Sequence, residues 1–135
     1  MILMIDDEKR ALDSYFSELQ MSNFRVSFES SVDAGLKLFE ENSTELELLI
    51  LDLMMPYGEA FNEDETERGF KTGVRFYERV RATNERLPII ILTNSVDEGT
   101  RKFFEKDPHC QFFEKEQLLP FELADVVRDV LEKAK

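Results

Sequence analysis

Five polar side chains stand at the ends of short apolar runs, and their types suit phosphoryl-group chemistry. They are Asp6, Asp7, Asp52, Thr93 and Lys115. If the runs end at one place, three carboxylates crowd there, and like charges raise one another's pKa unless a cation lies among them. Oxygen ligands alone suit Mg²⁺, which binds one or two carboxylates and keeps several waters. A hydroxyl and an ammonium beside the acids would stabilise a phosphoryl group, and Asp52 would be the nucleophile that becomes an aspartyl phosphate.

The apolar runs that carry these residues are predicted to be strands of one sheet. Strands are expected at residues 1–5, 24–28, 46–51, 87–92 and 110–113, and helical spacing predicts helices at 8–21, about 30–42, from 72 onward, 97–106 and 121–133. Strict alternation of strand and helix implies right-handed crossovers and a parallel sheet covered on both faces. The predicted fold is therefore an α/β, three-layer, flavodoxin-like (βα)5 sandwich, with a parallel five-stranded sheet in the order 2-1-3-4-5.

This strand order brings the candidate residues to one edge of the sheet. Ligands of open α/β sheets bind at the carboxyl ends of the strands, near the point where the strand order reverses. The first and third strands are neighbours at that point, so Asp6, Asp7 and Asp52 should share a cleft. Thr93 ends the fourth strand and Lys115 ends the fifth, so both should face the same rim.

Two predicted helix starts carry capping signals. Ser30 and Ser31, followed by Asp33, predict a start of the capping-box type for the second helix. Thr72 is predicted to cap the third helix. Between the third strand and the third helix, residues 57–71 lose all apolar periodicity and contain two glycines, which indicates a long loop.

The charge balance excludes whole classes of partner. The 29 acidic and 17 basic residues give a net charge of −12, which argues against a generic nucleic-acid binder, because such binding needs Lys and Arg to displace counterions. It equally argues against attachment to an anionic membrane surface. The apolar runs are far shorter than the roughly 20 residues that cross a bilayer. Cys110 is the only cysteine, so no intrachain disulfide is possible, and a cytoplasmic protein is expected. The length predicts one domain over residues 1–135.

Four segments, taken in order, resemble the receiver domains of two-component response regulators. "MILMIDDE" is similar to the opening strand and acid pair of that family, and "LLILDLMMP" to its phosphoacceptor strand. "PIIILTNS" resembles the strand that bears the switch hydroxyl, and "FFEK" the strand that bears the lysine. The resemblance covers essentially the whole chain. Any one motif is weak, but four motifs in the right order on the right strands are specific.

The resemblance implies a magnesium site with named ligands. Asp7 corresponds to the direct metal ligand of the family, and Asp6 to a ligand that acts through water. Asp52 corresponds to the phosphoacceptor, which also binds the metal. The backbone carbonyl of Met54 is expected to complete the protein ligands.

The resemblance also implies a switch and its partners. Thr93 and Lys115 correspond to the pair that senses the phosphoryl group, and Phe112 to the aromatic residue that changes rotamer together with Thr93. The phosphoryl donor in the family is a phosphohistidine on a sensor histidine kinase or a histidine phosphotransfer protein. Phosphorylation repacks the surface of the fourth helix, fifth strand and fifth helix, which here would contact an unidentified output protein. Such a domain is a phosphoacceptor regulator and not a conventional enzyme.

An acidic insertion departs from the family pattern. Family members pass from the phosphoacceptor strand to the next helix in a tight turn, but here residues 57–71 intervene. The stretch Glu59–Arg68 holds five acids against one arginine. Charge runs are usually solvated loops; the functional alternatives are an interaction segment beside the phosphorylation site or a lid over it.

Three single residues also depart from the pattern. Glu116 follows Lys115 where the family commonly has proline, and Asn94 follows Thr93 where it usually has a small residue. Met54, two residues after Asp52, is apolar and cannot orient a hydrolytic water, which predicts slow intrinsic dephosphorylation.

Other interpretations of these residues stay open. A receiver-like interaction module could keep the fold without turning over phosphate, as Asn94 and Glu116 suggest. A phosphohydrolase is disfavoured, because such enzymes typically place an acid where Met54 stands. Phe112 could be a simple core aromatic, His109 a turn residue and Cys110 a small buried apolar group. Because Lys135 directly follows the fifth helix, a stand-alone domain is expected, the alternative being a fragment of a larger protein.

Overall fold

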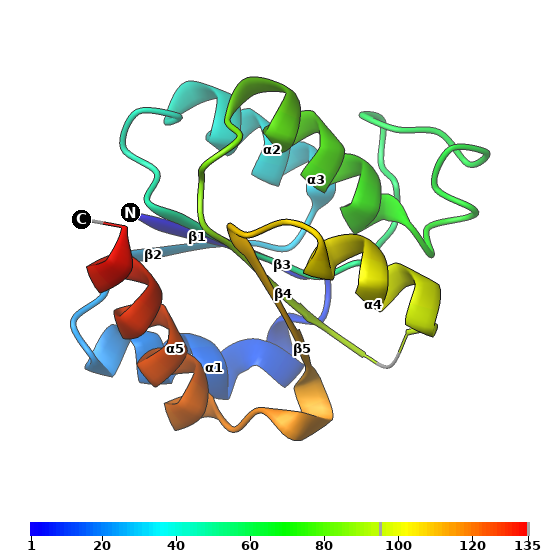
Figure 1. The fold of residues 1–135 in the computed structure, drawn as a ribbon. Helices are drawn as coiled ribbons and strands as arrows, with labels where there is room; N and C mark the ends of the chain where they lie inside the picture. Colours follow the sequence, from blue (N-terminus) through cyan, green and yellow to red (C-terminus); the bar gives the residue numbers. More distant parts are fainter. Residues whose placement is uncertain (95, 135) are drawn as a thin grey trace.

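A central sheet of five parallel strands carries the fold (Figure 1). The computed structural model describes residues 1–94 and 96–134, so Ser95 of the "PIIILTNS" segment lies outside the described residues. The strands are β1 (Ile2–Ile5), β2 (Val26–Glu29), β3 (Leu48–Leu51), β4 (Ile89–Thr93) and β5 (Cys110–Glu114). Their order is β2-β1-β3-β4-β5, and every pairing is parallel. The predicted fold class and strand order are confirmed.

Helices cover both faces of this sheet. They are α1 (Lys9–Met21), α2 (Val32–Glu41), α3 (Thr72–Thr83), α4 (Glu98–Glu105) and α5 (Pro120–Lys133), and a 3₁₀ turn, η1 (Lys115–Gln117), connects β5 to α5. α1 and α5 lie side by side on one face, and α2 and α3 cover the other (Figure 1). The second, third and fourth strands begin two residues later than predicted. Within the described residues, no helix is both long and apolar enough to span a membrane.

The central strands are buried on both sides, which explains their unbroken apolar sequences. In β1, Leu3 and Ile5 face the core under α2 and α3, whereas Ile2 and Met4 face the core under α1 and α5. The same alternation divides β3 between the two cores. A strand covered on both faces needs apolar residues at every position. β2, at the edge of the sheet, is only partly buried, as its mixed composition predicts.

Both capping predictions need correction. Ser31 does cap α2, because its hydroxyl accepts the Ala34 N–H at 3.1 Å. The capping box is wrong, since alanine occupies the third helical position and the Asp33 carboxylate turns away to the β3–α3 connection. The N-cap prediction for Thr72 is also wrong. Thr72 is the first residue of α3, fully buried, and its hydroxyl donates to the Met55 carbonyl at 2.5 Å.

The connection between β3 and α3, residues 52–71, is tied down at several points. The Asp33 carboxylate accepts N–H bonds from Glu59 at 2.9 Å and Ala60 at 2.8 Å. Arg75 of α3 donates to the Glu65 carbonyl at 2.7 Å. Phe61 is 7% exposed and joins the core on the α2–α3 side. The segment therefore packs as part of the domain surface and extends beside the acidic end of the sheet.

Candidate functional site at the carboxyl edge of the sheet

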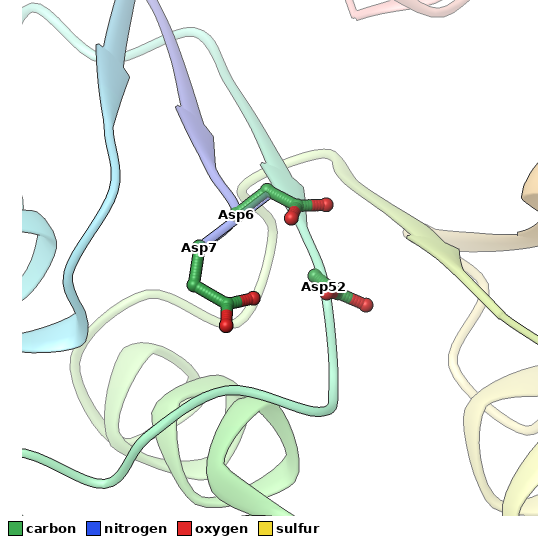
Figure 2. Close-up of side chains that lie close together, drawn as sticks. All are labelled: Asp6, Asp7 and Asp52. Atoms are coloured by element: carbon green, nitrogen blue, oxygen red, sulfur yellow. The ribbon is translucent and has the colours of Figure 1, made fainter. Parts of the chain in front are cut away.

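Three carboxylates gather where β1 and β3 end. Asp6 and Asp7 follow β1, Asp52 follows β3, and one carboxylate oxygen from each lies within 4.8 Å of the others (Figure 2). The sheet register causes this arrangement, because Ile5 pairs with Leu51 and the Asp52 N–H donates to the Ile5 carbonyl at 3.1 Å. The acid cluster that the strand order predicts is therefore present.

Burial makes the Asp52 carboxylate costly to ionise. Asp52 is 3% exposed and Asp6 is 1% exposed. Burial, and next the charge of Asp6, raise the pKa of Asp52 to about 6, against the lowering effects of its Thr93 hydrogen bond and of Lys115. The residue Asp7 is exposed as a whole, but partial burial of its carboxyl and the charge of Asp6 raise its pKa as well.

The two oxygens of Asp52 have different surroundings. Oδ1 accepts the Thr93 hydroxyl at 2.6 Å and the Leu53 N–H at 2.8 Å. Oδ2 lies 3.6 Å from the Lys115 ammonium nitrogen. The predicted hydroxyl and ammonium thus both reach Asp52, one at each oxygen.

Lys115 joins the cluster as its cation. Its Nζ lies 2.8 Å from Asp6 Oδ2 and 4.0 Å from Glu8 Oε2. Burial alone would lower the pKa of Lys115, but contact with Asp6 and the charge of Asp52 outweigh burial and raise it, so the side chain stays an ammonium. One ammonium offsets only one of the three clustered aspartates.

The residues of the cleft fit a divalent cation. Asp6 Oδ2 and Lys115 Nζ are buried and, although close, are not aligned for a hydrogen bond with each other or with any other described group. Buried charges of this kind are destabilising unless further partners compensate them. An ion of charge +2 would offset the two remaining negative charges, and an all-oxygen ligand set suits Mg²⁺. Asp6, Asp7 and Asp52 are the residues that could hold it.

Met54 lies beside the acids in an open pocket of about 580 Å³. The pocket is lined by Asp7, the segment from Met54 to Gly58, and Arg68, Gly69 and Phe70 from the far end of the same connection. The β3–α3 connection thus forms the wall of a hollow next to Asp7. The assignment of the Met54 carbonyl as a metal ligand stays a prediction.

Phe112 sits on the same side of the sheet as the core under α3 and α4. Its ring centre is 5.9 Å from that of Phe104, and Arg101 of α4 lies over the ring at 4.8 Å. The Arg101 guanidinium is in turn paired with Glu114 at 2.8 Å. Sequence reasoning missed Arg101 and Glu114 as neighbours of Phe112. The switch role of Phe112 stays a prediction.

Two further residues shape the site and were also missed. A Cβ at Gly73 would lie 2.0 Å from the Asp52 carbonyl oxygen, so only glycine lets α3 approach the backbone of the proposed nucleophile. The sequence signal was a glycine in the first turn of a helix, where it lowers helix propensity without local benefit. The second residue is Tyr15, whose hydroxyl reaches the Lys115 turn from α1. Asn94 is exposed at the end of β4.

Comparison with solved structures identifies the fold. No protein-family model matches the sequence, and no curated protein matches it either. Solved structures do match. A CheY-like response regulator receiver domain protein from Methanospirillum hungatei aligns with a TM-score of 0.78 at 18% identity over 98% of this chain and 93% of that chain.

Two other receiver domains match equally well. The receiver domain of the Francisella response regulator 1452 has a TM-score of 0.78 at 19% identity over 99% of this chain and 98% of that one. A response regulator receiver domain protein from Clostridium thermocellum has a TM-score of 0.79 at 22% identity, with 98% and 94% covered. The chain therefore has the fold of response regulator receiver domains, as its four sequence motifs predict.

Proposed function

We propose that this chain is a phosphoacceptor signalling domain of a two-component phosphorelay, in which Asp52 receives a phosphoryl group. One observation carries the proposal. On a receiver-domain fold, Asp52 shares a cleft with Asp6 and Asp7, and its two oxygens meet the Thr93 hydroxyl and the Lys115 ammonium. This is the set of groups that phosphoryl transfer to a carboxylate requires.

The chemistry assigns a role to each residue of the cleft. Asp7 and Asp52, with Asp6 acting through water and the Met54 carbonyl, would hold Mg²⁺, which offsets charge on the phosphoryl oxygens. An Asp52 carboxylate oxygen attacks phosphorus, so the new P–O bond forms as the P–N bond to the donor histidine breaks. The Thr93 hydroxyl can then leave Oδ1 and donate to a phosphoryl oxygen. The Lys115 ammonium balances the added charge from the other side.

The signal would leave through protein contact. Movement of Thr93 toward the phosphoryl group would vacate space that Phe112 can enter, and the surface of α4, β5 and α5 would repack. We assign residues 1–135 to one receiver domain, cytoplasmic, with residues 57–71 as an acidic insertion. Its partners would be a sensor histidine kinase or a histidine phosphotransfer protein and an output protein. The apolar Met54 beside the site supports a long-lived phosphorylated state.

Intact-mass measurement tests the proposal directly. Purified protein incubated with acetyl phosphate and Mg²⁺ should gain the mass of one phosphoryl group, and Asp52→Asn should abolish the gain. Asp64→Asn, an equally conservative change in the exposed insertion, should leave it intact. If neither acetyl phosphate nor a phosphorylated histidine kinase raises the mass, the chain is instead a receiver-like module that acts without phosphorylation, the alternative that Asn94 and Glu116 favour.

A further inference from the structure

The turn that carries Lys115 is weakly held by its own backbone. Lys115 opens η1, and the Leu118 N–H donates to the Lys115 carbonyl at a long 3.5 Å. Glu116 and Gln117 are exposed. Nevertheless the Lys115 side chain is only 10% exposed, and its ammonium lies among the buried acids. Something outside the turn must therefore fix the backbone from which that side chain extends.

Tyr15, in the middle of α1, supplies that support. Its hydroxyl lies 2.5 Å from the Leu118 carbonyl and 3.0 Å from the Lys115 carbonyl. These carbonyls bracket the turn, so a single side chain holds both its beginning and its end. Burial raises the pKa of Tyr15 above its ordinary 10.0, so the hydroxyl keeps the proton that it donates.

The Tyr15 hydroxyl is not needed to fill the core. Tyr15 is 8% exposed, and its ring packs in the core between the sheet, α1 and α5, where a phenylalanine ring would fit equally well. The one O–H group of Tyr15 is shared between two carbonyls of the Lys115 turn as a bifurcated hydrogen bond, at separations of 100 and 103 residues. α1 begins two residues after Asp7. The element that follows the metal-binding acids thus also holds the turn of the lysine.

We propose that Tyr15 is a positioning residue for Lys115, whose hydroxyl fixes the turn so that the ammonium reaches a phosphoryl group on Asp52. The inference rests on the proposed function, and it adds a residue from outside the cleft to that function. Tyr15 acts only through Lys115 and touches none of the reacting atoms.

Kinetics of a double-mutant cycle test the role. Tyr15→Phe should slow phosphorylation by acetyl phosphate at saturating Mg²⁺ about tenfold, the scale of one lost hydrogen bond in a transition state. In the Lys115→Ala background the same change should have no further effect, because residues that act through one another are not additive. The proposal is wrong if Tyr15→Phe leaves the rate of phosphorylation unchanged. It is also wrong if Tyr15→Phe lowers that rate by the same factor in the Lys115→Ala background as in the wild type.

Tyr77→Phe is the matched control. Tyr77 is also 8% exposed, and its hydroxyl makes a part-buried hydrogen bond to Asp107. Tyr77 belongs to the core on the opposite face of the sheet from Tyr15. Both variants keep the ring, so both should fold. Tyr77→Phe loses a hydrogen bond to a carboxylate and should therefore lose at least as much stability as Tyr15→Phe. Only Tyr15→Phe should slow phosphorylation, and an equal loss of rate in Tyr77→Phe would overturn the proposal.

Nuclear magnetic resonance separates this inference from the proposed function. With lysine labelled at Cε, the Lys115 signal should shift in Tyr15→Phe and stay in place in Tyr77→Phe. An unmoved Lys115 signal in Tyr15→Phe would refute the positioning role even if the chain is phosphorylated. A chain that never gains a phosphoryl group would instead refute the proposed function, while the Lys115 signal still reports whether Tyr15 holds the turn.

Discussion

The molecule has two acidic regions whose carboxylates lie in different physical surroundings. The cleft holds three aspartates, two of them buried at the ends of central strands. The insertion holds five acids, all of them exposed: Glu59, Glu63, Asp64, Glu65 and Glu67. The difference teaches that burial, and not acid content, decides where negative charge needs a compensating partner.

Three of the five acids of the insertion have local partners. Glu67 pairs with Lys71 at 2.9 Å, Glu63 lies 3.5 Å from Arg68, and Glu65 accepts the Asn62 N–H at 3.1 Å. Such exposed pairs contribute little to stability because water and salt screen them. In the cleft, by contrast, the buried carboxylate of Asp52 has a raised pKa. The free energy of ionising Asp52 therefore depends on whether a cation is bound in the cleft.

The largest expected effect is the pH dependence that Asp52 gives to the metal-free protein. Because its pKa rises from an ordinary value of 3.8 to about 6 in the folded state, the folded protein binds this proton more tightly than the unfolded chain. Its contribution to stability is therefore fully present below pH 3.8 and lost as pH rises through about 6. A shift of this size corresponds to about 3 kcal/mol.

Chemical denaturation from about pH 4 to about pH 7 measures this effect as a difference. The free energy of unfolding of the wild type minus that of Asp52→Asn should fall by most of that amount as pH rises, and the subtraction removes the contribution of groups that do not interact with Asp52. Saturating Mg²⁺ should flatten the difference, because the ion stabilises the ionised carboxylate. If the free energies of unfolding of the wild type and Asp52→Asn change in parallel with pH in the absence of metal, burial does not raise the pKa of Asp52.

The next largest effect is the loss of metal affinity when a cleft acid is removed. Loss of a group that only orients a metal ligand typically weakens metal affinity roughly 10- to 100-fold. Asp7→Asn removes a proposed ligand itself and should weaken Mg²⁺ binding at least as much. Titration calorimetry measures it. Asp64→Asn, which removes the same charge from the insertion, should change the affinity less than about twofold, since exposed charges are screened within about 8 Å. Equal losses of Mg²⁺ affinity in both variants would show that the cleft does not bind the ion more specifically than the insertion does.

A smaller effect is expected where the insertion is anchored. Asp33→Ala removes the acceptor of the Glu59 and Ala60 N–H groups, which should cost about 1 to 2 kcal/mol for two hydrogen bonds. Amide exchange should rise within residues 57–71, while Mg²⁺ affinity stays unchanged. Asp33→Asn keeps one oxygen acceptor and should lose less. Unaltered exchange in Asp33→Ala would mean that other contacts hold the insertion.

The cleft could be predicted from the sequence, whereas the anchors of the insertion could not. Asp6 and Asp52 each follow an apolar run, and parallel pairing of those runs forces the two residues together. The position of each strand and the order of the strands, from which this proximity follows, can be predicted from apolar periodicity and the crossover rules. The bonds from Asp33 to Glu59 and from Tyr15 to Leu118 join a side chain to distant backbone groups. Nothing in local sequence spacing signals such a partner, so the spacing wrongly predicts Asp33 as part of a capping box.

The smallest expected effect comes from neutralising the insertion altogether. Replacing its four glutamates by glutamine and Asp64 by asparagine should change the free energy of unfolding by less than about 0.5 kcal/mol per substitution, as for most surface changes. The rate of phosphorylation by acetyl phosphate should also stay unchanged, because Asp33 would still anchor the segment and none of the five side chains belongs to the cleft. A loss of rate with this small donor would place the insertion in the chemical site. A loss confined to a protein donor, and weakened by salt, would instead identify an electrostatic docking surface, since charges at a rim act mainly on association.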